Sequence, residues 1–114
     1  MIAVIFESWP ALGKTQNYLE MGAALGEHLD SLDGFISIER FQSVVGPGKL
    51  LALSFSRDEA AVENWRKTDI HRAIRANSRR TIFKDYRLRV AAVLRDYGLF
   101  EREQAPADSR AAHD

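Results

Sequence analysis

Trp65 and His71 lie close together near the middle of the chain, and they are the first candidates for chemistry. An imidazole changes charge near neutral pH, so His71 could remove a proton from a weakly acidic substrate. Trp65 offers a large apolar surface, which in a small domain often serves only to anchor the core. A histidine on a helix is likewise common without any role, so a purely structural interpretation stays open for both residues.

Arginines gather at two places in the second half of the chain. Arg75, Arg79 and Arg80 fall near the end of a predicted helix, and Arg87, Arg89 and Arg95 fall on one face of the last predicted strand. A guanidinium binds a carboxylate through two parallel hydrogen bonds, so these residues could hold an anionic ligand. The structural alternative is that they pair with acidic residues of a second copy, for which the candidates are Glu7, Glu39 and Asp96.

Three further strand residues could contribute to a ligand site. Glu7 falls in the interior of the first predicted strand, where loss of solvent would raise the pKa of its carboxyl and make it a base; pairing with an arginine is the alternative. Phe83 and Tyr86 lie at the start of the last predicted strand and could line a cavity. The hydroxyl of Tyr86 could also form a hydrogen bond there.

Composition excludes several classes of protein. The chain has 114 residues, enough for one domain, and its formal net charge of zero argues against a protein devoted to nucleic acid. It has no cysteine, which excludes thiolate catalysis and cysteine-ligated metals, and Asp, Glu and His do not gather at metal-ligand spacing. No signal peptide or membrane span is recognisable. We therefore expect a cytoplasmic protein that binds no metal of its own, no nucleic acid and no membrane.

The elements that must position these residues follow from hydrophobic periodicity. Alternating or β-branched runs predict strands over residues 2–9, 35–45, 49–56 and 82–97, and the helical period predicts a helix over 14–32. A second helix should begin at Ser56, whose pairing with Glu59 matches a capping box, and break near Lys67 before Thr68 starts a further segment to about Arg79.

The order β-α-β-β-α-β predicts an α+β fold of the ferredoxin-like type, an antiparallel sheet with both helices on one face. Residues 1–98 would form this domain, and the polar segment 99–114 would be a tail, disordered or wrapped around a partner. The uncovered sheet face and the overlong last strand predict a homodimer formed through the sheet faces and that strand.

With these residues in order, the chain resembles the antibiotic biosynthesis monooxygenase (ABM) family of dimeric α+β barrels. The resemblance rests on Leu32-Asp33-Gly34-Phe35, on the segment Leu51-Ala52-Leu53-Ser54-Phe55, and on Asp58-Glu59-Ala60-Ala61-Val62 leading to Trp65 and a histidine. It implies that Trp65 lines a cavity between helices and sheet. Similar members include cofactor-independent oxygenases of polyphenolic compounds, haem-degrading oxygenases and domains without a known reaction.

Three hypotheses therefore stand. The first is a monooxygenase that oxidises a phenol- or quinol-type compound without a cofactor, with His71 as base, Trp65 and Arg75 beside it, and Glu7, Phe83, Tyr86 and Arg87 around the substrate. The second is a haem-binding or haem-degrading protein with His71 on the iron, although the haem-degrading members would have their histidine where this sequence has Arg75. The third is a non-catalytic dimeric binding domain.

Overall fold

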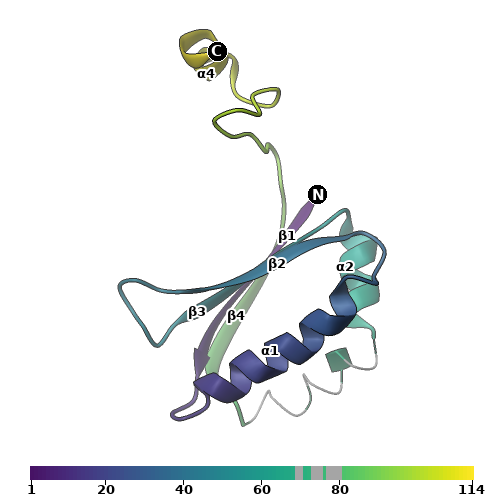
Figure 1. Ribbon diagram of the computed structural model, residues 1–114, viewed down its shortest axis with the longest axis vertical. Coiled ribbons are helices and arrows are strands. Elements are labelled where there is room, and N and C mark those ends of the chain that lie inside the picture. The colour runs from purple at the N-terminus through teal and green to yellow at the C-terminus, as the bar shows by residue number, and fades with distance from the viewer. Residues whose placement is uncertain (69–70, 73–75, 77–80) are drawn as a thin grey trace.

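The computed structural model describes residues 1–68, 71–72, 76 and 81–114. The elements are β1 (Ile2–Pro10), α1 (Thr15–Leu29), β2 (Phe35–Gln42), β3 (Leu50–Ser56), α2 (Glu59–Arg66), β4 (Phe83–Ala92) and α4 (Ala107–His113). The strands form one antiparallel sheet in the order β2-β3-β1-β4, and α1 and α2 lie on the same side of it (Figure 1). The ferredoxin-like α+β fold predicted from the sequence is confirmed.

Strand alternation divides the sheet residues between two faces. Phe6 on the central strand β1 pairs with Ala52 of β3 and Leu88 of β4, and all three face the helices. Their chain neighbours point to the opposite face, which no helix among the described residues covers (Figure 1). A side chain's face therefore decides whether it can meet a ligand under the helices or another molecule outside.

Two irregularities modify this alternation. Phe35 pairs with Ser56 whereas Ser37 pairs with Phe55, so Ile36 is an extra residue in β2. A regular strand would place Phe35 and Ser37, two residues apart, on the same face; the extra residue instead returns Phe35 to the helix-facing side. A second register shift lies between Trp9 and Pro10: Trp9 pairs with Asp85 of β4, whereas Pro10 pairs with Phe83.

The junction before β2 positions the start of α2. Gly34 has a φ of +83°, and its carbonyl accepts a 2.7 Å hydrogen bond from the backbone N–H of Arg57. The Arg57 guanidinium binds both carboxylate oxygens of Asp33, at 3.0 and 3.2 Å, and it lowers the pKa of that carboxyl. This pair ties the α1–β2 turn to the β3–α2 turn.

The cap of α2 differs from the prediction. Asp58, not Ser56, is the N-cap, and its Oδ1 accepts a 2.9 Å hydrogen bond from the N–H of Ala61. Ser56 is still held in β3 by its pairing with Ile2, so Asp58 is the residue whose side chain can reach the first turn. The predicted break near Lys67 is confirmed, because α2 ends at Arg66 and Lys67 is its C-cap. Most of the further segment to Arg79 lies outside the described residues.

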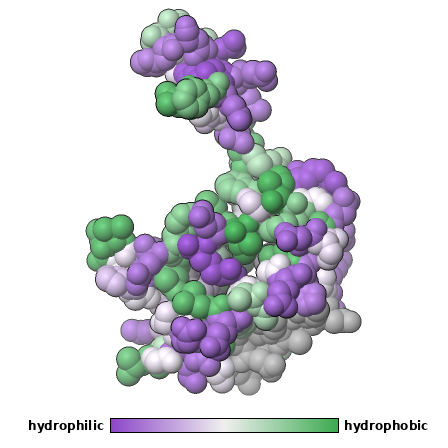
Figure 2. All heavy atoms as spheres, in the orientation of Figure 1, coloured by the Kyte–Doolittle hydropathy of each residue, from purple (hydrophilic) through white to green (hydrophobic). Residues whose placement is uncertain are grey.

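The last strand is shorter than predicted. It ends at Ala92, opposite Ile2 at the start of β1, because β1 has no strand residue left to pair with the positions beyond Ala92. The chain then leaves the sheet and leads to α4, clear of the domain (Figures 1 and 2). Arg102 holds this tail together through Gly98, Ser109 and Asp114. The segment predicted to be disordered thus contains a short helix; its wrapping around a partner stays a prediction.

Candidate functional site

A pocket of about 500 Å³ lies between the two helices and the sheet. Its floor consists of helix-facing strand residues, mostly apolar: Val4, Phe6, Ile38, Ala52, Leu88 and Val90. Its roof comes from α1, where Tyr18, Met21 and Leu25 recur at the helical period on one face. Such a concave apolar space with a few polar groups is the usual form of a small-molecule site.

Aromatic rings close one part of the pocket. The ring centroid of Phe6 lies 5.5 Å from those of Phe83 and Tyr86, and Tyr18 lies 5.5 Å from Phe83. In a regular strand, residues 83 and 86 would point to opposite faces. They share the pocket because the register shift near Pro10 places an extra residue between them. The sequence predicted both residues for the cavity but not the bulge that brings them there.

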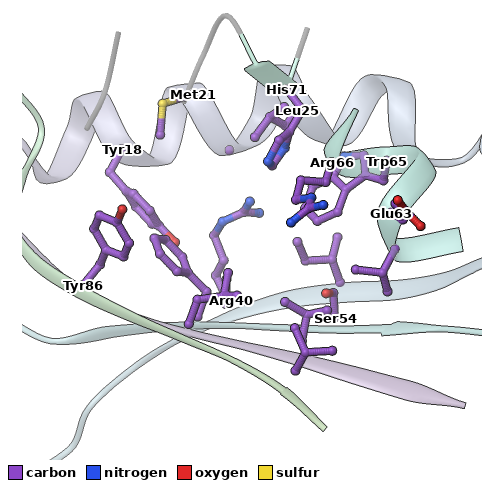
Figure 3. A pocket seen from close by; sticks show the side chains of 18 of the residues that line it. Tyr18, Met21, Leu25, Arg40, Ser54, Glu63, Trp65, Arg66, His71 and Tyr86 are labelled. Carbon is purple, nitrogen blue, oxygen red and sulfur yellow. The ribbon is translucent and has the colours of Figure 1, made fainter. Parts of the chain in front are cut away.

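Trp65 and His71 form the other part of the lining, as Figure 3 shows. Their ring centroids are 4.6 Å apart. Thr68 fixes this arrangement at the break after α2: its hydroxyl donates to the carbonyl of Trp65 at 2.9 Å and accepts from the backbone N–H of His71 at 3.3 Å. The Nδ1 atom of His71 is buried. Two candidates that the sequence singled out are thus brought together; Arg75 lies outside the described residues.

Arg40 is the pocket residue that sequence reasoning missed as a ligand contact. It faces the helices from β2, opposite Ala52, and its guanidinium carbon lies 5.9 Å from the centre of the Tyr18 ring. In Figure 3 its guanidinium reaches up from the sheet into the pocket. The sequence signal was available, because Ile38 and Arg40 are two residues apart and therefore share one face of the strand.

Charged side chains of α2 line the pocket as well, but they are exposed. Glu59, Glu63 and Arg66 all remain accessible to solvent. Glu63 bonds to Lys67 at 2.7 Å, and this ammonium lowers the pKa of the Glu63 carboxyl. Glu63 therefore already has a cationic partner outside the apolar interior.

Glu7 and Arg87 lie on the opposite side of the sheet from the pocket. They pair directly across β1 and β4, and both share the uncovered face. The carboxylate of Glu7 forms ion pairs with Lys49 and Arg89, and the hydrogen bond from Lys49 is the main cause that lowers its pKa. The expectation that burial raises this pKa is wrong, and the alternative of pairing with an arginine is confirmed. The structure does not bring Glu7 or Arg87 to the pocket.

Neither a metal-binding cluster nor a membrane-spanning helix is found in the described part of the chain. Within residues 1–68, 71–72, 76 and 81–114, no three His, Asp or Glu side chains lie close enough together to hold a metal ion. None of the helices in these ranges is long and apolar enough to cross a membrane.

Comparison with known proteins identifies the class. Residues 1–77 match the model of the antibiotic biosynthesis monooxygenase family, and the chain belongs to this family. It is 40% identical over 93 residues to a protein of Pyricularia oryzae named jasmonate monooxygenase ABM. That alignment covers 82% of this chain but only 43% of the relative, so the chain spans less than half of the relative's length.

Solved structures agree on the fold. A protein of this family name from Deinococcus radiodurans superposes with a TM-score of 0.77 at 8% identity, covering 86% of this chain and 97% of that one. One from Nitrosomonas europaea gives 0.72 at 14% identity, covering 82% and 99%. At such identities the likeness concerns the arrangement of helices and strands alone.

Proposed function

We propose that this chain oxidises an electron-rich aromatic compound of the phenol or quinol type in the pocket beneath its helices, without a cofactor. The observation that carries the proposal is the contact between Trp65 and His71 in an apolar pocket of about 500 Å³. A base beside an aromatic wall can deprotonate a bound phenol and hold its ring against the indole. Membership of the monooxygenase family supports the same reaction class.

The proposed reaction needs no external reductant. His71 accepts the proton of the phenolic hydroxyl, and the electron-rich ring then forms a bond to dioxygen at the carbon para to that oxygen. The O–O bond breaks with loss of the hydrogen on that carbon. One oxygen atom stays in the ring as a new carbonyl, and the other leaves as water with the two hydrogens. Phenol and dioxygen thus give quinone and water, and dioxygen is the oxidant.

Oxygen uptake with a panel of phenols, quinols and anthrones tests the proposal, with jasmonate added because the Pyricularia relative is named for it. His71→Ala should lower the rate by roughly 10²- to 10⁴-fold, the usual contribution of a general base. The matched control is His28→Ala, which removes an exposed histidine from α1. Equal loss in both variants, or full activity in His71→Ala, would contradict the role of His71.

Haem is the second candidate ligand, as substrate and cofactor together. The observation in its favour is that the pocket holds an imidazole, His71, together with two guanidinium groups, Arg40 and Arg66, of the kind that bind propionates. Bound haem would supply oxygen activation and His71 would hold its iron. A saturating one-to-one Soret shift that disappears in His71→Ala would favour haem. The absence of both haem binding and oxygen uptake would favour a non-catalytic binding domain.

We also propose that the chain forms a homodimer through its uncovered sheet face and last strand. Leu51, Leu53 and Phe55 are only partly buried on that face, and Phe41 is 43% exposed. Leu94, Leu99 and Phe100, which come after β4, are more than 80% exposed, at 83%, 81% and 91%. Apolar surface of this extent usually marks an interface, and a second copy would bury it.

A further inference from the structure

We propose that Arg40 binds the carboxylate of the substrate, so that the pocket selects apolar molecules that carry an anionic group. The inference uses the same pocket as the proposed oxidation and deepens it by naming a substrate class. It concerns binding, however, so it can be tested without any turnover.

Arg40 has a buried hydrogen-bond donor that is not satisfied by the described residues. The Nε atom of Arg40 is buried, and it has no hydrogen-bond partner within the described part of the chain. No ion pair between Arg40 and a carboxylate is found among the same residues. A buried N–H donor without an acceptor is costly, so a carboxylate supplied from outside that accepts from this N–H would be bound strongly.

The fold leaves room for the Arg40 guanidinium against α1. A Cβ atom at position 22 of α1 would lie 2.6 Å from the guanidinium carbon of Arg40 and 2.8 Å from its Nε. Only glycine therefore allows the side chain to lie against the helix in this way. On the sheet side, Arg40 stands opposite the small side chain of Ala52. The small residues Gly22 and Ala52 thus leave the space that the Arg40 side chain occupies in the pocket.

The charged groups around the pocket also favour an anionic ligand. The two carboxylates among the residues that line the pocket, Glu59 and Glu63, come from α2 and are exposed. Glu63 already forms an ion pair with Lys67. Arg66 adds a second positive charge to the same lining. An anion that brings an apolar body would thus bury that body against the aromatic rings and satisfy Arg40 at once.

A pair of fluorescent probes tests the inference: 2-naphthoate, which carries a carboxylate, and 2-naphthylmethanol, which has the same ring system without the charge. Arg40→Met should weaken naphthoate binding by about 10- to 100-fold, the worth of a charge-assisted hydrogen bond. Binding of the alcohol should stay within about twofold. Arg40→Lys should retain part of the preference, since it keeps the charge but not the planar fork.

Arg87→Met is the matched control, because it removes the same charge from the opposite face of the sheet. It should leave the binding of both probes unchanged. Equal loss of naphthoate affinity in Arg40→Met and Arg87→Met would overturn the inference, since the electrostatic potential of the whole protein would then explain the preference for the anion. Failure of the wild-type chain to prefer naphthoate over the alcohol would overturn it as well.

Gly22→Ala provides a second test that leaves the charge in place. Its methyl group must displace the flexible end of Arg40, while alanine favours the helix more than glycine. Naphthoate affinity should therefore fall although the protein unfolds at an equal or higher temperature. An unchanged preference for naphthoate in Gly22→Ala would contradict the inference.

Carboxylate binding without oxygen uptake would reject only the proposed oxidation. Oxygen uptake that does not change when Arg40 is replaced would reject only the role of Arg40.

Discussion

Replacement of Gly34 tests how the turn before β2 holds α2, and with it Trp65, over the pocket. A methyl group on Gly34 would lie 2.7 Å from the Cβ atom of Ala61, in the first turn of α2. Neither atom can rotate away, because both are fixed to backbone. Gly34 also has a φ of +83°, which side chains adopt only with strain. Two separate penalties should therefore add in Gly34→Ala.

The size of each penalty can be separated with a matched variant. Gly13 has a similar φ of +75°, but a Cβ atom there would meet nothing within 4 Å. Gly13→Ala should cost only the left-handed strain, about 1–2 kcal/mol. Gly34→Ala should cost that amount plus an overpacking term of about 1–3 kcal/mol, so about 2–5 kcal/mol in total.

Urea unfolding followed by tryptophan fluorescence measures these differences. The double variant Gly34→Ala with Ala61→Gly removes the clash, so it should be more stable than Gly34→Ala, although Ala61→Gly alone lowers helix stability by about 1 kcal/mol. If Gly34→Ala proves no less stable than Gly13→Ala, or if Ala61→Gly does not rescue it, the contact between the turn and α2 does not position the helix as argued.

Two further predictions concern the outer face of the sheet. The pKa of Glu7 is lowered by Lys49 and Arg89, so its stabilising contribution is present above the unfolded-state value of 4.5 and is lost as the pH falls through the lower folded-state value. The urea concentration at the unfolding midpoint should therefore depend less on pH between pH 5 and 3 in Glu7→Gln than in the wild type. An unchanged pH dependence in the variant would refute this. Phe41→Glu should shift the chain from dimer to monomer in light-scattering chromatography, whereas Leu12→Glu, an exposed loop control, should not; a wild-type monomer at micromolar concentration would reject the dimer.

Much of the fold could be predicted from the sequence because its elements carry strong local signals. The helical period of α1, the neighbouring strands β2 and β3 and the break near Lys67 depend on residues close together in the chain. Trp65, His71, Phe83 and Tyr86 were candidates by residue type and by resemblance to the family, and the structure places all four in the pocket lining. Their roles in a reaction stay predictions.

The failures have a common physical cause, which is pairing between distant segments. Glu7 was predicted to contact substrate because its position in β1 is interior, but only the partners in β3 and β4 reveal that its face is the outer one. Ser56 matched a capping box by spacing, yet its pairing with Ile2 keeps it in the sheet. The pocket contact of Arg40 depends on Gly22, eighteen residues earlier, and no local pattern joins them.

The bulge at Ile36 explains how one strand can serve both the turn and the pocket. The hairpin sets Arg40 opposite Ala52, which directs its guanidinium toward the helices. At the other end of β2, Phe35 must also face the helices, beside Gly34 and its contact with α2. Residues 35 and 40 differ by an odd number, so a regular strand would place them on opposite faces. The extra residue Ile36, which is 53% exposed, removes this conflict. Phe35 can therefore face the helices at the turn while Arg40, and not Glu39, faces the pocket.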